Sequence, residues 1–109
     1  MFTKSGGGTL ITIMPIYIAI PLTPSSSALN EAIEKHIVST TDRYKLQSDR
    51  GWLVKFDGTT LELSDRIGLT GQEKGVPSPI GSAIVVPVTG YYGRGPMDMW
   101  EWLKVRLEE

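Results

Sequence analysis

The segment Ile16-Tyr17-Ile18-Ala19-Ile20 constrains the fold of this chain more than any other feature of the sequence. A β-strand sends successive side chains to opposite faces of its sheet, so this segment places apolar groups on both faces. Such a strand is covered on each side, or it is covered on one side and paired with a partner on the other. The segment therefore predicts a central strand in a layered protein.

The size of the chain suits one hydrophobic core. It has 109 residues, of which 40% are hydrophobic and 21% are charged. We therefore expect one α+β domain over residues 14–109, because two independent cores would need a longer chain. Residues 1–13 contain Ser5-Gly6-Gly7-Gly8 and are predicted to form a flexible or extended arm. The alternative is a strand extension, since residues 9–13 alternate as a strand would.

The charge and the cysteine content narrow the classes of function. A formal net charge of -1 gives no overall field that would draw the protein to nucleic acid or to an anionic membrane. The chain has no cysteine, which excludes disulfides and thiolate metal sites and fits a cytoplasmic location. Residues 10–22 are apolar, but Pro15 and Pro21 interrupt them and they fall short of the roughly 20 residues of a membrane span. No membrane partner is expected.

A helix and a hairpin are predicted after the first strand. Beyond the turn at residues 21–24, the serines at 25–27 offer an N-cap. The apolar face that follows at helical spacing consists of Leu29, Ala32, Ile33, His36 and Ile37. Residues 44–47 and 52–56 then flank a turn that ends in glycine, which predicts a β-hairpin.

A second, shorter helix has clear start and stop signals. Thr59 and Glu62 form a Thr-x-x-Glu capping box, and Leu63 and Ile67 share one face. Gly68 supplies a C-terminal cap. These residues predict a helix of about two turns.

The remainder of the chain predicts a loop, a strand and a final helix. Residues 70–81 contain three glycines and two prolines and should form an exposed loop. Residues 82–89 are β-branched and apolar, and Pro87 among them indicates an edge strand or a bulge. Asp98 and Glu101 resemble a second capping box. The apolar stripe of the last helix is Met99, Trp100, Leu103 and Leu107.

This order of elements is the split βαβ pattern. Strand, helix, hairpin, short helix and strand, followed by one more helix, predict a ferredoxin-like βαββαβ sandwich with an added C-terminal helix. We expect two layers, the sheet and its helices. In that topology the first and third strands lie at the centre, and the last strand lies at the edge beside the first.

The chain also resembles a known group of proteins over about two thirds of its length. Residues 44–55 read Tyr-Lys-Leu-Gln-Ser-Asp-Arg-Gly-Trp-Leu-Val-Lys and are followed by a Thr-led helix containing Glu-Leu-Ser-Asp-Arg-Ile at 62–67 and by an Ile/Val strand. This order resembles the small ferredoxin-like proteins related to the CRISPR-associated adaptation endonuclease and its toxin-like relatives.

What this resemblance implies is a homodimer without nuclease activity. The nucleases of that group place an Asp at the end of the first strand to hold a metal near the dimer axis. Here that place reads Ala19-Ile20-Pro21-Leu22, so the nuclease activity does not carry over to this chain.

No catalytic, cofactor or metal site is predicted. His36 is the only histidine, so no histidine pair can hold a metal or build a triad, and we interpret it as a half-buried packing residue. The acids at 49, 57, 62 and 65 match neither a calcium loop nor a catalytic carboxylate pair. Capping by Glu62 and turn formation at 49 and 57 account for three of them, and Asp65 is expected to be solvated.

Two groups of residues are candidates for binding. The loop at 90–95 precedes a helix and could bring Arg94 and backbone N–H groups to an anion, with Tyr91 and Tyr92 as stacking surfaces. The alternative is a tight turn whose tyrosines simply pack. On the last helix, Trp100, Trp102 and Val105 widen the apolar arc beyond what one sheet face can cover. They are candidates for a contact with a partner, unless the loop at 70–81 folds over them.

Two functions follow from these candidates. The first is a small non-catalytic protein that acts by protein–protein contact, as a homodimer or with another protein partner. The alternative is a nucleic-acid-binding or nucleotide-binding protein, a degenerate relative of the ferredoxin-like nucleases, that uses the tyrosines and Arg94 of the loop.

Overall fold

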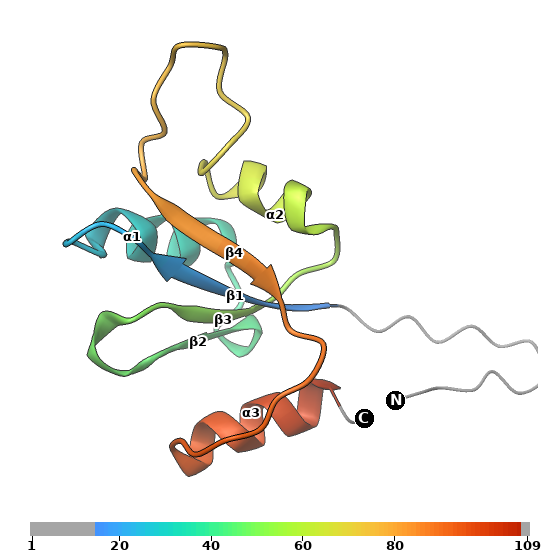
Figure 1. Ribbon diagram of the computed structural model, residues 1–109. Helices are drawn as coiled ribbons and strands as arrows, with labels where there is room; N and C mark the ends of the chain where they lie inside the picture. The colour runs from blue at the N-terminus through green and yellow to red at the C-terminus, as the bar shows by residue number, and fades with distance from the viewer. Residues whose placement is uncertain (1–14, 108–109) are drawn as a thin grey trace, which may run out of the picture.

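The computed structural model describes residues 15–107 and shows a four-stranded antiparallel sheet with three helices (Figure 1). The strands are β1 (Ile16–Pro21), β2 (Arg43–Lys45), β3 (Trp52–Lys55) and β4 (Ala83–Pro87). The helices are α1 (Ser27–His36), α2 (Thr60–Arg66) and α3 (Met97–Leu107), with two 3-10 turns, η2 (Thr40–Asp42) and η3 (Gln47–Asp49). The predicted α+β class is confirmed. The predicted arm at residues 1–13 lies outside the described residues.

The sheet has the strand order β2-β3-β1-β4, and every neighbouring pair is antiparallel. On β1, Ile18 lies opposite Leu53 of β3 and opposite Val86 of β4. Therefore β1 and β3 lie at the centre and β2 and β4 at the edges. Pro87 is the last residue of β4, where a missing N–H can face away from β1.

The side chains of one face of the sheet form the larger core with α1 and α2. From β1, Tyr17 and Ala19 point to this side. The other buried members of this core are Leu29, Ile33, Ile37, Trp52, Val54, Phe56, Leu63, Ile67 and Ile80. The Tyr17 hydroxyl donates a hydrogen bond of 2.5 Å to the Gly58 carbonyl, so its one polar atom has a partner.

The opposite face of the sheet is covered by α3. Ile16 and Leu53 are buried against Leu103, which is 3% exposed. Figure 1 shows α3 on the other side of the sheet from α1 and α2. The fold therefore has three layers, and the expectation of two layers is wrong. The alternating apolar groups of β1 account for this result, because both of its faces need a cover.

The local sequence signals give mixed results at the helix ends. In α2, the Glu62 N–H donates to Thr59 Oγ1 at 3.1 Å and the Thr59 N–H donates to Glu62 Oε1 at 2.8 Å, so the first capping box is confirmed. The second predicted capping box, formed by Asp98 and Glu101, is wrong. Because α3 begins at Met97, Asp98 lies inside the helix. The Pro96 carbonyl accepts the Met99 and Trp100 N–H groups at 3.1 and 3.2 Å, so Pro96 stands at the start of the helix.

The loop at residues 70–81 is mostly exposed, as predicted, and projects away from the sheet on the side of α1 and α2 (Figure 1). Ile80 is buried in the core of that face, and Ser78 Oγ donates to the Gly68 carbonyl at 2.9 Å. The loop therefore does not cover α3, and the alternative in which it shields Trp102 is wrong.

Candidate functional site

The loop at 90–95 separates its three candidate residues. The Tyr92 ring is fully exposed, at 104%, and Arg94 is exposed as well. The Tyr91 ring instead stacks on Trp100, with 5.7 Å between ring centroids and 22° between planes. The Asp98 carboxylate accepts the Met99 N–H at 3.0 Å, which places a negative charge at the start of α3. This charge disfavours an anion at that helix end.

The three candidates on α3 point in different directions. Trp102 is half-buried, 6.3 Å from the Tyr44 ring and under the Arg106 guanidinium at 4.2 Å. Trp100 is half-buried on the other flank of α3 and donates from Nε1 to the Gly95 carbonyl at 3.1 Å. Val105 points to solvent and is 55% exposed. Therefore most of the extra apolar surface of α3 is used within the same chain.

Polar contacts hold α3 on the segment that leads into β2. Arg106 donates from both Nε, at 3.0 Å, and Nη2 to the Thr41 carbonyl, while its Nη1 donates to the Trp102 carbonyl of the same helix at 3.0 Å. Near the other end of α3, Asp98 accepts a hydrogen bond from Tyr44. Burial raises the pKa of the Tyr44 phenol, and Asp98 raises it further through this bond and its charge.

We expect the pKa of Tyr44 to fall toward 10.0, without reaching it, when Asp98 is replaced by Asn. Burial, the larger cause, remains in that variant. The neutral phenol stabilises the fold below its unfolded pKa, and this contribution is lost as the pH rises through the raised folded value. An ultraviolet titration of wild type, Asp98→Asn and Tyr44→Phe measures the shift. A Tyr44 pKa unchanged in Asp98→Asn would contradict the assignment.

A polar cleft of about 540 Å³ lies where α1 begins. Its lining is Pro21, Thr23, Pro24, Ser25, Ser26, Ser27, Asn30, Ser48 and Asp49.

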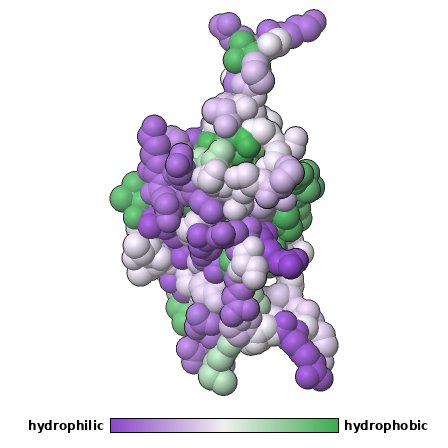
Figure 2. All heavy atoms as spheres, turned by 90° about the vertical axis from the view of Figure 1, so that its left-hand side faces the viewer, coloured by the Kyte–Doolittle hydropathy of each residue, from purple (hydrophilic) through white to green (hydrophobic). Residues whose placement is uncertain are grey.

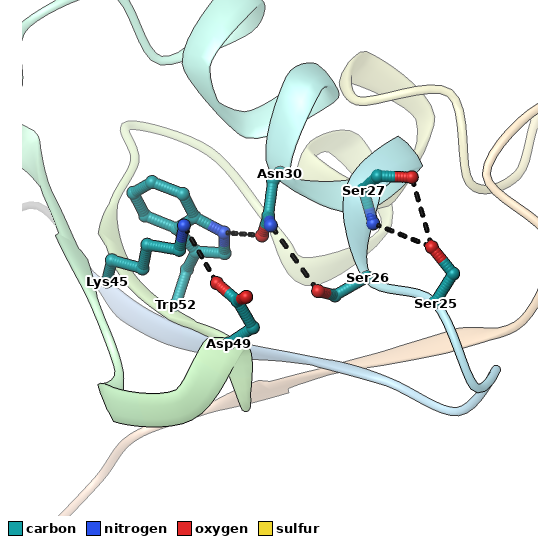
Figure 3. A network of polar contacts seen from close by, with 7 residues as sticks. All are labelled: Ser25, Ser26, Ser27, Asn30, Lys45, Asp49 and Trp52. Atoms are coloured by element: carbon teal, nitrogen blue, oxygen red, sulfur yellow. Dashed lines mark hydrogen bonds and ion pairs between the residues drawn. The ribbon is translucent and has the colours of Figure 1, made fainter.

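The side of the molecule in Figure 2 is largely hydrophilic, with hydrophobic residues in small separate groups. In Figure 3, Trp52 Nε1 donates to Asn30 Oδ1 at 2.8 Å, and Lys45 forms a 2.8 Å ion pair with Asp49. The Trp52–Asn30 bond joins the hairpin to α1, and the Lys45–Asp49 pair lies within the hairpin, so both contacts have a structural role.

Within residues 15–107 no strand pairs with the outer edge of β4, a surface that the sequence-based candidates did not include. On the α3 side of the sheet, Ile84 and Val86 are 45% and 40% exposed. On the α2 side, a groove of about 470 Å³ runs between α2 and β4. It is lined by Leu22, Thr60, Leu61, Ser64, Leu69, Thr70, Gly81, Ser82, Ala83, Ile84 and Val85. The sequence contains one signal of this surface, which is the absence of any charged residue between Lys74 and Arg94.

The residues considered for catalysis have structural roles or stand apart. Within residues 15–107, no group of three or more acids and histidines is placed to hold a metal ion. Glu62 caps α2 and Asp49 pairs with Lys45. Asp65 is exposed, in agreement with the expectation of a solvated side chain, and its carboxylate accepts a 2.5 Å hydrogen bond from Thr70 Oγ1.

The comparisons with known proteins do not assign a family. No protein family, no curated protein and no solved structure matches this chain. In the part of the chain that the structure describes, none of the helices has the length and apolar character needed to cross a bilayer.

Proposed function

We propose that this chain is a ferredoxin-like protein that acts by protein–protein contact as a homodimer and does not catalyse a reaction. The strand order β2-β3-β1-β4, with two helices on one face, supports the ferredoxin-like assignment. The relationship to the proteins around the CRISPR-associated adaptation endonuclease stays a prediction, as does a cytoplasmic location. β1 ends in Ala19-Ile20-Pro21 without an Asp, so the proposal includes no nuclease activity.

The observation that carries the proposal is the open edge of β4. Unpaired strand edges that are apolar and uncharged associate with other strands, and natural proteins usually protect them with charges or a covering element. Ile84 and Val86 are exposed along this edge. Pro87 blocks backbone pairing only at the last residue of β4. We therefore expect a strand of a partner to pair with the rest of this edge.

The solution mass tests the proposal directly. Sedimentation equilibrium at rising protein concentration should show a species of twice the 12.0 kDa chain mass. A protein that stays at the mass of one chain up to about 100 µM, well above the micromolar affinities of ordinary contacts, would contradict the homodimer.

A second candidate function is single-stranded nucleic-acid binding. The fully exposed Tyr92 ring beside the exposed Arg94 favours it, because base stacking and phosphate contacts are the usual means of such binding. Binding of short RNA should weaken with salt and with Arg94→Ala. Arg50→Ala serves as the control, because Arg50 is an exposed arginine in the turn between η3 and β3. No detectable RNA binding at low salt would exclude this function.

A further inference from the structure

The backbone of β4 alternates between bonds to β1 and groups that face the open side. The Val88 N–H donates to the Ile16 carbonyl at 2.8 Å, and the Leu22 N–H donates to the Ser82 carbonyl at 2.9 Å. In an antiparallel pair every second residue exchanges such bonds. The backbone N–H and C=O groups of the even-numbered residues of β4 therefore point toward β1. The N–H and C=O groups of Ala83 and Val85 therefore face outward, together with the carbonyl of Pro87.

We propose that two copies of the chain pair along β4 in antiparallel fashion, about a twofold axis at Val85. This inference rests on the proposed homodimer and gives it a surface and a register. Val85 of one copy would exchange N–H and C=O bonds with Val85 of the other. The Ala83 N–H would donate to the Pro87 carbonyl of the second copy. Pro87 then lies at the end of the pairing, where its missing N–H costs least.

The same register brings the exposed side chains together. Ile84 of one copy lies opposite Val86 of the other, as a pair without direct backbone bonds, in which side chains approach most closely. These two residues are 45% and 40% exposed in one chain, so pairing would bury them against each other. On the other face, Leu61 of α2 and Leu22 lie along the groove beside β4 and are 65% and 62% exposed.

The features of the edge favour a second copy as the occupant. A symmetric contact needs a surface that is complementary to itself, and like charges across the axis would oppose it. β4 and the residues around it carry no charge from Gly75 to Gly93. The register about Val85 pairs apolar residues with apolar residues throughout.

A charge placed on the edge tests the contact surface. We expect Val86→Lys to raise the dimer dissociation constant at least about 100-fold, because two lysines would lie in an apolar contact next to the axis. Val105→Lys is the matched control, since Val105 is a valine of similar exposure on α3. Val105→Lys should remain a dimer, and both variants should keep the circular dichroism spectrum of the wild type.

Cysteine crosslinking tests the register, because the chain has no cysteine of its own. Opposite residues of such a pair have Cα atoms about 4.5 Å apart, whereas diagonal neighbours are about 7–8 Å apart and exceed the reach of a disulfide. A mixture of the Ile84→Cys and Val86→Cys variants should therefore oxidise to a covalent dimer, and each variant alone should not.

The outcomes separate this inference from the proposed function. A wild-type dimer that Val86→Lys leaves intact, with no crosslink in the mixture, would overturn the β4 pairing while the homodimer stands. A wild-type protein that is monomeric, or that binds only a different protein at this edge, would overturn both.

Discussion

Replacing Gly51 with alanine is expected to destabilise the fold by roughly 3 kcal/mol or more. Gly51 has φ +136, and a Cβ there would lie 2.3 Å from the Ala19 carbonyl oxygen of the central strand. A positive φ costs a residue with a side chain about 1–2 kcal/mol. Overpacking against a backbone that is paired on both sides typically adds about 1–3 kcal/mol.

Urea unfolding of Gly51→Ala beside Gly75→Ala measures the steric part of this effect. Gly75 has φ +89, but a Cβ there would meet no atom within 4 Å. Gly75→Ala should therefore show only the conformational cost of about 1–2 kcal/mol. Equal losses in the two variants would contradict the close approach of Gly51 to β1.

Replacing Leu103 with alanine is expected to lower the free energy of unfolding by about 2–5 kcal/mol, the usual range for a buried leucine. Leu103 is 3% exposed and is the residue of α3 that is buried with Ile16 and Leu53. Its loss would leave a cavity between α3 and the sheet. The loss of stability should be this large only if α3 packs on the sheet as it does in the structure.

The matched control for this prediction is Val105→Ala, two residues further along α3. Val105 is 55% exposed, so its truncation should change stability by less than about 0.5 kcal/mol. Thermal or urea unfolding of both variants gives the comparison. A loss of less than about 1 kcal/mol for Leu103→Ala would mean that α3 does not pack on the second face of the sheet.

Much of the fold could be predicted because its signals are local. The capping box of Thr59 and Glu62 acts within four residues, and a hairpin follows from two apolar runs around a turn that ends in Gly51. β1 needed only its alternating side chains to be recognised as a strand with two covered faces. In each case the physical cause lies within the segment itself.

The third layer and the start of α3 depend on contacts between distant residues. Asp98 and Glu101 have the spacing of a capping box, but the helix already begins at Met97, where the Pro96 carbonyl accepts the Met99 and Trp100 N–H groups. The glycine-rich segment before α3 does not determine on which face of the sheet the helix packs. Its place is set by contacts such as Trp102 with Tyr44, which lies on β2.

The candidate site could be predicted only in part for the same reason. The apolar arc of α3 suggested a partner surface, but Tyr44 and Arg106 cover much of Trp102 within the chain. The edge position of β4 was readable from Pro87. The exposure of Ile84 and Val86 was not, because it depends on which part of the sheet α3 covers.

Amide hydrogen exchange at Val85 tests the central claim, that the open edge of β4 is covered by a second copy. The Val88 N–H, which is bonded to Ile16, serves as the internal reference. We predict that the Val85 amide is protected and that its protection rises with protein concentration, because its N–H would then be bonded across the dimer. A Val85 amide that exchanges rapidly at every concentration, while Val88 stays protected, would contradict the account.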